Sequence, residues 1–150
     1  MLILWLVIVS SITACQWISA THSPDMFGGA NWLKTAALIT IVTGLAIRWS
    51  ALFSLGKAFS ANVAIREAQT INTSGLYGLV RHPSYLGLLL VFVAVGLYSR
   101  HWLAFAFATI PTTAALLYRI HVEEAALLLA FGDEYLAYSR RTKLLIPGVV

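Results

Sequence analysis

The chain has 150 residues, of which 59% are hydrophobic and only 11% charged, whereas an average soluble domain has about 25% charged residues. With a mean hydropathy of +0.81, this composition excludes an ordinary water-soluble domain and indicates one small helical membrane protein. The net charge is +4, but the basic residues are spread along the chain, which argues against a nucleic-acid-binding protein. The single cysteine, Cys15, excludes an intrachain disulfide and a multi-cysteine metal site.

Two apolar segments come first. Residues 2–20 are long enough to cross about 30 Å of hydrocarbon. A signal peptide is the alternative, but no Lys or Arg precedes the apolar run, as one normally would. After a polar connector, the second segment runs from Trp32 to Leu55 and carries Arg48 near its end. Snorkelling of Arg48 to the interface beside Trp49 is the simpler interpretation, and a place in a functional site is the alternative.

A long polar stretch separates the two halves of the chain. Residues 56–80 lack a long apolar period, and loops of this length are usually functional. Pro83 then opens a third apolar segment, Ser84 to Tyr98, because the first position of a helix needs no amide donor. At roughly 22 Å this helix is shorter than a bilayer core, so we expect its start to lie below the membrane surface in a protein-lined pocket.

The fourth segment begins at Trp102 and is expected to continue as one helix to about Phe131. Pro111, in its middle, removes one backbone hydrogen bond and should kink it. Gly132 is interpreted as the stop of this helix. Asp133 is then the cap of a last amphipathic helix that reaches about Arg141.

Charge sets the expected orientation. Lys34 and Arg100 fall on one side of the predicted helices, and the other basic residues, apart from Arg48, fall on the opposite side: Lys57, Arg66, Arg81, Arg119, Arg140, Arg141 and Lys143. By the positive-inside rule, both termini and the long loop are predicted to be cytoplasmic. The fold class is therefore an all-α, multi-pass integral membrane protein with about four transmembrane helices, a cytoplasmic loop and a C-terminal amphipathic helix. We expect one membrane-embedded domain over 1–150, with N-terminal helices 2–55 and a functional part 56–148.

Familiar cofactor devices are missing: there is no G-x-G-x-x-G, P-loop, H-E-x-x-H or C-x-x-C. The first polar cluster that remains is the turn from Gly75 to Tyr85, whose glycines permit close approaches and whose Tyr77, His82 and Tyr85 offer hydrogen-bonding tips. A helix-entry turn with lipid-facing tyrosines is an equally good interpretation of this turn.

The second cluster lies where the fourth segment leaves the membrane. Arg119 and Glu123 share one helix face, as do His121 and Glu124. A solvated ion pair worth about 0.3–0.5 kcal/mol is the plain alternative. A metal site formed by His82, His121, Glu123 and Glu124 is a further alternative, since imidazole and carboxylate bind several metals, but no metal-ligand spacing supports it.

These residues carry a resemblance to a known family. The chain resembles the isoprenylcysteine carboxyl methyltransferase family, integral membrane enzymes that use S-adenosyl-L-methionine, over about residues 53–148. The similarity lies in three ordered motifs: Gly75-x-Tyr77-x-x-x-Arg81-His82-Pro83-Ser84-Tyr85-x-Gly87, then Arg119-x-x-x-Glu123-Glu124, then Phe131-Gly132-x-Glu134-Tyr135-x-x-Tyr138.

The resemblance implies a S-adenosylmethionine-dependent methyltransferase that acts on a lipophilic acceptor. The cofactor is expected in a cytoplasmic pocket capped by the C-terminal helix. Arg119 and Glu123 are the expected catalytic residues, with Arg119 facing the acceptor. The expected cofactor-binding residues are Gln69, Thr70, Ile71, Asn72, Tyr77, His82, Pro83, Ser84, Tyr85, Glu123 and Glu124.

The sequence leaves the identity of the methyl acceptor open. A prenylated cysteine carboxylate is already ionised near pH 7 and needs no general base, and Arg119 could orient it with a two-pronged contact. A phospholipid amine or another small lipophilic amine or thiol would need a proton acceptor, for which His121 is the nearest candidate. A non-catalytic membrane binding subunit is the alternative outside enzymology. The expected partners are thus a lipophilic or prenylated acceptor and membrane lipids, with no metal and no nucleic acid; the oligomeric state is left open.

Overall fold

A computed structural model of the chain describes residues 2–23, 25–55 and 71–146. Within these residues the fold is all-helical, and the one β-type contact is an isolated parallel bridge between Val80 and Lys143. The elements, in chain order, are α1 (Leu2–Thr21), η1 (Met26–Gly29), α2 (Trp32–Leu55), η3 (Gly75–Gly78), α3 (Pro83–Ser99) and α4 (Trp102–Arg141). Gln69 and Thr70 of the predicted site lie outside the described residues, as do Lys57 and Arg66.

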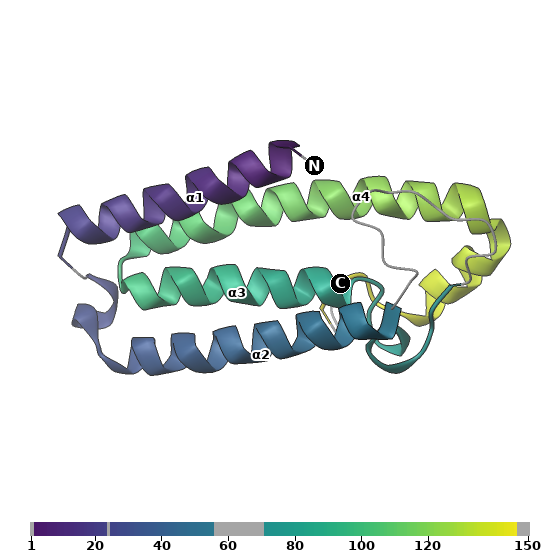
Figure 1. The fold of residues 1–150 in the computed structure, drawn as a ribbon, viewed down its shortest axis with the longest axis horizontal. Helices are drawn as coiled ribbons and strands as arrows, with labels where there is room; N and C mark the ends of the chain where they lie inside the picture. Colours follow the sequence, from purple (N-terminus) through teal and green to yellow (C-terminus); the bar gives the residue numbers. More distant parts are fainter. Residues whose placement is uncertain (1, 24, 56–70, 147–150) are drawn as a thin grey trace.

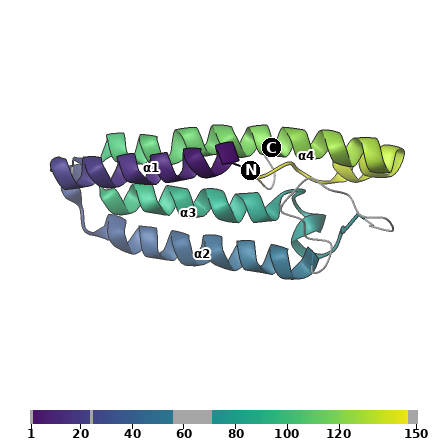
Figure 2. The ribbon, with the colours of Figure 1, turned by 45° about the horizontal axis from the view of Figure 1, so that its top comes forward.

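The four long helices run side by side (Figures 1 and 2). Helix α3 packs between α2 and α4, while α1 lies along α4 and touches α3 only slightly. Each apolar run predicted from the sequence is confirmed as one helix. The second run has the predicted bounds, and the first and third differ from α1 and α3 by one residue at an end or at each end.

Within the described part of the chain, two helices, α2 and α4, are long and apolar enough to span a membrane. Only 17% of the most apolar stretch of α2 is buried inside the molecule. A core helix of a soluble protein would be mostly covered, so this outward apolar surface is suited to lipid. Helices α1 and α3 are apolar but contribute shorter stretches. The helical fold class is thus confirmed, while the number of spans and the cytoplasmic loop stay predictions.

Glycine allows α2 and α3 to approach each other closely. A Cβ atom on Gly87 of α3 would lie 2.5 Å from the carbonyl oxygen of Gly44 on α2, and a Cβ on Gly44 would lie 2.7 Å from that of Gly87. Such contacts between small residues drive helix association in lipid, where apolar burial adds little. The close approach fixes the start of α3 beside the end of α2, which is where the predicted site lies.

Polar contacts at one end of the bundle hold its two connections together. The backbone amide of Trp102, the first residue of α4, donates to Asp25 Oδ1 at 2.9 Å. The amides of Asp25 and Met26 donate to the carbonyl oxygen of Arg100. The connection between α1 and α2 is thereby tied to the turn between α3 and α4. The end of α2 and the start of α3 lie at the opposite end of the bundle (Figure 1).

Helix α4 is interrupted once. As one continuous helix, its 40 residues would be about 60 Å long, twice the hydrocarbon thickness, so we expect its portion from about Arg119 onward to lie beyond the core. Gly132 has φ 51° and ψ −123° and is its one residue with non-helical dihedral angles, which confirms the predicted break there. We call residues 133–141 the returning helix. Pro111 lies inside α4 with helical dihedral angles, so the expected kink does not take the form of a broken helix.

Candidate functional site

The polar turn before α3 is built by local geometry. Gly75 has φ +56°, a value that glycine adopts without strain, and it opens the short helix η3. Pro83 stands at the first position of α3, with the buried His82 as the residue before it. The turn is also paired with the chain end, because the amides of Arg81 and His82 donate to the carbonyl oxygens of Lys143 and Leu144 at 2.8 and 3.2 Å.

Four side chains form what we call the clasp: Arg81, His82, Glu124 and Tyr135. Arg81 Nε, His82 Nε2 and Tyr135 Oη lie 3.1, 2.7 and 2.5 Å from one atom, Glu124 Oε1. An ionised carboxylate has no proton to give, so all three partners donate to it. The clasp joins the turn before α3, the late part of α4 and the returning helix.

Electrostatics keep the Glu124 carboxyl group ionised and the Tyr135 hydroxyl protonated. Burial by itself would raise the pKa of Glu124, but the hydrogen bonds from His82, Tyr135 and Arg81 outweigh burial and lower the pKa from 4.5 to about 2. Burial and the Glu124 carboxylate together raise the pKa of the Tyr135 hydroxyl. At neutral pH the carboxylate is therefore charged and the phenol remains a donor.

The carboxylate of Glu123, the residue before Glu124, belongs to a different set of hydrogen bonds. Tyr85 Oη donates to Glu123 Oε2 at 2.8 Å, and Arg119 Nε lies 3.4 Å from the same hydroxyl. All three side chains are partly buried. The structure thus brings together Arg119 and Glu123, the two residues predicted to be catalytic, with Tyr85 of α3 between them.

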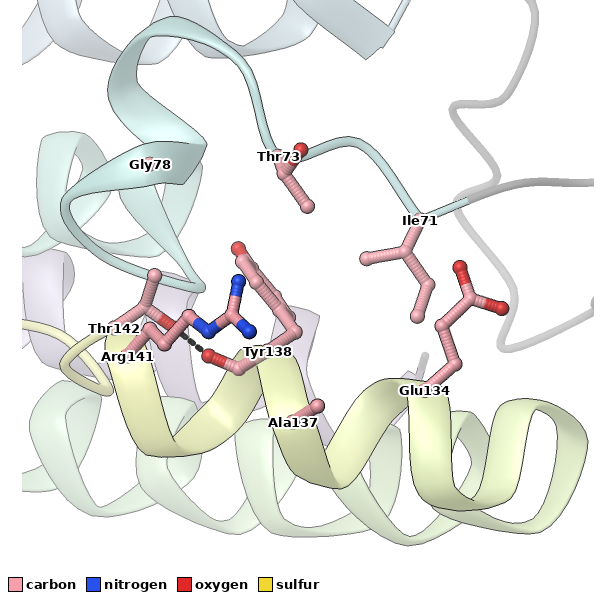
Figure 3. A pocket seen from close by; sticks show the side chains of 8 residues that line it. All are labelled: Ile71, Thr73, Gly78, Glu134, Ala137, Tyr138, Arg141 and Thr142. Atoms are coloured by element: carbon pink, nitrogen blue, oxygen red, sulfur yellow. Dashed lines mark hydrogen bonds between the residues drawn. The ribbon is translucent and has the colours of Figure 1, made fainter.

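A pocket of about 340 Å³ lies between the segment before α3 and the returning helix. Figure 3 shows the phenol of Tyr138 and the guanidinium of Arg141 on one side of the opening and Ile71 with Glu134 on the other. The eight lining residues are Ile71, Thr73, Gly78, Glu134, Ala137, Tyr138, Arg141 and Thr142. This volume lies within the range of small-molecule sites, roughly 300–1,000 Å³.

Three other residues predicted to bind the cofactor, Asn72, Tyr77 and Pro83, are not among those that line the pocket. Asn72 donates to the carbonyl oxygen of Ser54 at 3.0 Å and accepts from the amide of Ser74. The carbonyl oxygen of Tyr77 accepts from Tyr138 Oη at 2.7 Å. Pro83 is buried at the start of α3. Of the predicted segment 69–72, Ile71 lines the pocket.

Ser84 has a partner that the sequence did not assign. Arg48 Nη1 lies 3.2 Å from the carbonyl oxygen of Ser84 and 3.3 Å from its hydroxyl. Arg48 thus donates to the start of α3, in addition to any contact with the membrane interface. The sequence placed Arg48 and the helix entry on neighbouring segments but offered no signal that pairs them.

The sequence analysis also missed part of the pocket wall. Glu134, Ala137, Tyr138 and Arg141 all line it, and their spacing of three, four and seven residues places them on one helix face. This part of the pocket wall could therefore have been identified from the spacing of these residues in the sequence.

Comparisons with known proteins agree with the geometry. The model of the isoprenylcysteine carboxyl methyltransferase family matches residues 37–129. The chain is 37% identical to methanethiol S-methyltransferase 2 of Bradyrhizobium diazoefficiens, over 87% of this chain and 49% of that protein. It is 29% identical to protein-S-isoprenylcysteine O-methyltransferase of Xenopus laevis, over 88% of this chain and 46% of that protein. The chain therefore spans about half the length of these curated relatives.

A solved structure has the same fold. The eukaryotic intramembrane Ras methyltransferase, an isoprenylcysteine carboxyl methyltransferase, superposes with a TM-score of 0.78 at 24% sequence identity. The match covers 96% of this chain and 52% of that one. The arrangement of α1 to α4 is thus that of a known membrane fold.

Proposed function

Because the chain belongs to the isoprenylcysteine carboxyl methyltransferase family, we propose that it transfers a methyl group from S-adenosyl-L-methionine to a lipophilic acceptor in the membrane. The observation that carries the proposal is the meeting of two distant motifs. The turn at residues 81–85 and the pair Glu123 and Glu124 join through hydrogen bonds of 2.7 to 3.1 Å. A pocket of suitable size lies between the segment before α3 and the returning helix, which Tyr135 links to Glu124.

The residues of the pocket fit the proposed cofactor. Glu134 and Arg141 carry opposite charges on the same helix face, which suits a zwitterionic amino-acid end. The ring of Tyr138 offers an aromatic face to a cation. When bound, S-adenosylmethionine supplies an electrophilic methyl group on a cationic sulfonium. The segment 71–73 and the returning helix would hold it, with Gln69, Thr70 and Asn72 as further candidate contacts from the sequence.

The residues around Tyr85 have a separate task, which is to place the acceptor. Tyr85 donates to Glu123 and accepts from Arg119, so the phenol holds the guanidinium and the carboxylate at defined positions. Arg119 would bind a carboxylate acceptor in a two-pronged contact. Such an acceptor is ionised near neutral pH, so these residues need only orient it and exclude water, which can supply much of the acceleration.

The membrane context supports a lipophilic acceptor. The chain is an integral membrane protein by its apolar helices and its fold. We propose that the end of the bundle with Arg81, Arg119 and Lys143 faces the cytoplasm, since basic residues favour that side. An acceptor with a long apolar chain would then reach the site from the bilayer.

A thiol is the second candidate acceptor, and one observation favours it. The relative with 37% identity is named for methanethiol. A thiol has to lose a proton before it attacks, because its pKa is well above 7. His121, which is exposed on α4 two residues from Arg119, is a candidate proton acceptor. A membrane binding subunit without turnover remains the non-enzymatic candidate.

Product analysis separates these candidates. Purified protein in lipid nanodiscs is incubated with methyl-labelled S-adenosylmethionine and either a farnesylated cysteine or a short alkyl thiol. A carboxyl ester releases labelled methanol on treatment with base, whereas an S-methyl product does not. We expect base-labile label on the farnesylated cysteine. Label found only on the thiol would favour the second candidate, and binding without transfer to either acceptor would favour the binding subunit.

A further inference from the structure

The three side chains that donate hydrogen bonds to Glu124 come from two separate parts of the chain. Arg81 and His82 precede α3, and Tyr135 lies on the returning helix. All three bonds end on the same oxygen, Oε1. Oε1 therefore has no lone pair left for a ligand, because each carboxylate oxygen offers about two acceptor sites, and Glu124 is not among the residues that line the pocket.

A second set of bonds ties the same two regions together. Arg81 Nη1 donates to the carbonyl oxygens of Ser139 and Thr142 at 2.9 and 2.7 Å. These carbonyls belong to the last turn of the returning helix, where the helix itself supplies no donors. Arg81 is thus held by Glu124 at one nitrogen and caps the returning helix with another.

The returning helix depends on these bonds for its position. It is joined to the rest of α4 through Gly132, whose φ of 51° and ψ of −123° allow the chain to reverse. A Cβ atom on Gly132 would meet nothing within 4 Å, so the space on this side of the turn is open. The fixed points lie further on, at Tyr135, Tyr138 and Thr142.

The pocket depends on the position of the returning helix. Five of its eight lining residues, Glu134, Ala137, Tyr138, Arg141 and Thr142, come from positions 134–142. None of them lies in α4 before Gly132. Movement of the returning helix away from the turn would therefore remove most of the wall.

We propose that Glu124 is a positioning residue and not a cofactor ligand: through the clasp it holds the returning helix against the turn before α3 and so forms the cofactor pocket. The proposal rests on the proposed function for the identity of the ligand, but the clasp can be tested without any ligand. The proposal also gives two adjacent carboxylates different roles, since Glu123 is assigned to the placement of the acceptor.

The first test measures amide hydrogen exchange in nanodiscs without S-adenosylmethionine. Glu124→Gln removes the charge, and Tyr135→Phe removes one donor while it keeps the ring. Hydrogen bonds to charged groups are among the stronger ones in proteins, so we expect exchange of amides 133–146 to become at least about tenfold faster in both variants. Arg140→Gln, at an exposed position of the same helix, is the control and should exchange like the wild type.

The same variants then separate a positioning role from a ligand role. For a positioning residue, the Kd for S-adenosylmethionine rises about tenfold, while kcat at saturating cofactor stays within about threefold. Wild-type exchange of residues 133–146 in ligand-free Glu124→Gln, combined with a raised Kd, would overturn the proposal, since Glu124 would then act on the ligand directly.

A covalent rescue completes the test. Val80 and Lys143 face each other in the parallel bridge, and strand neighbours about 4.8 Å apart are within the range that a disulfide can join. Val80→Cys and Lys143→Cys are introduced into Glu124→Gln. Oxidation should restore slow exchange and the wild-type Kd, and reduction should abolish both effects. A closed disulfide that leaves the Kd raised would contradict the proposal. Failure of the wild type to bind S-adenosylmethionine would instead refute the proposed function and leave the exchange results as the test of the clasp.

Discussion

Glu123 and Glu124 are neighbours in the sequence, yet their carboxylates accept hydrogen bonds from different parts of the molecule. Glu123 Oε2 accepts from Tyr85 on α3, and Glu124 Oε1 accepts from Arg81, His82 and Tyr135. Successive residues of a helix point about 100° apart, so one helical turn presents a carboxylate to each of two groups. The pair therefore links the predicted acceptor side to the wall of the pocket.

Removal of the Tyr85 hydroxyl tests the acceptor side. In Tyr85→Phe, Glu123 loses its 2.8 Å donor and Arg119 loses a partner. We expect kcat/KM for the acceptor to fall about tenfold or more, as for the loss of a hydrogen bond to a charged group, with the Kd for S-adenosylmethionine unchanged. Steady-state kinetics and calorimetry measure the two effects. Tyr98→Phe, at an exposed position of α3, is the control, and an equal loss in that variant would contradict the assignment.

Gly132 is needed at this turn for its backbone dihedral angles, because there is room for a larger side chain. Gly132→Ala should destabilise the closed position of the returning helix by about 1–3 kcal/mol, because L-residues rarely adopt its dihedral angles. We expect faster proteolysis between residues 132 and 146 and a raised Kd for the cofactor. Gly28 also has a positive φ, +64°, with nothing near its Cβ position, but it lies at the other end of the bundle. Gly28→Ala should leave both measurements unchanged; if it alters them equally, the effect is not local to the turn.

The clasp predicts a defined pH dependence. Burial and three hydrogen bonds leave the pKa of Glu124 at about 2 in the folded chain, against 4.5 ordinarily. A lowered pKa means that the stabilisation is complete above about pH 4.5 and is lost as the pH falls towards 2. The difference in melting temperature between the wild type and Glu124→Gln should therefore be constant from pH 7 to 5 and shrink below 4.5. A difference that stays constant down to pH 2.5 would show that the carboxylate charge is not what the variant removes.

Close packing of α2 on α3 sets the position of the turn before α3. In Gly87→Ala the added Cβ would lie 2.5 Å from the Gly44 carbonyl oxygen and 2.7 Å from the Arg48 amide nitrogen, so the two backbones must separate. We expect a loss of about 1–3 kcal/mol of stability, the usual range for overpacking, measured by thermal unfolding in detergent. Ala46→Val, at an exposed position of α2, should have little effect. A Gly87→Ala variant as stable as the wild type would exclude the close contact.

Much of this arrangement could be predicted from the sequence. The apolar runs are separated by polar turns with Gly and Pro, so the helices were found with at most one-residue differences in α1, α2 and α3. The break at Gly132 was predicted because a glycine often ends a helix, and the aspartate that follows it is a common cap for the next helix. The meeting of residues 81–85 with Glu123 and Glu124 was implied by the resemblance of three motifs to one family.

The clasp and the pocket wall could not be predicted in the same way. Tyr135 reaches Glu124 only because Gly132 reverses the chain, and helical spacing alone places these two residues on a continuing helix. The pairing of Val80 with Lys143 joins residues 63 positions apart, and no periodic pattern encodes such a contact. Arg48 was similarly assigned to the interface, because the sequence does not reveal that the start of α3 packs beside it.

The most direct test of the central claim is a calorimetric titration of S-adenosylmethionine into the protein in nanodiscs, with two neighbouring substitutions. Ala137 lines the pocket and Leu136 does not, although both are exposed on the returning helix. If the pocket holds the cofactor, Ala137→Trp fills it and abolishes the heat of binding, while Leu136→Trp binds like the wild type. Equal binding by Ala137→Trp and the wild type, or no binding by the wild type, would contradict the account.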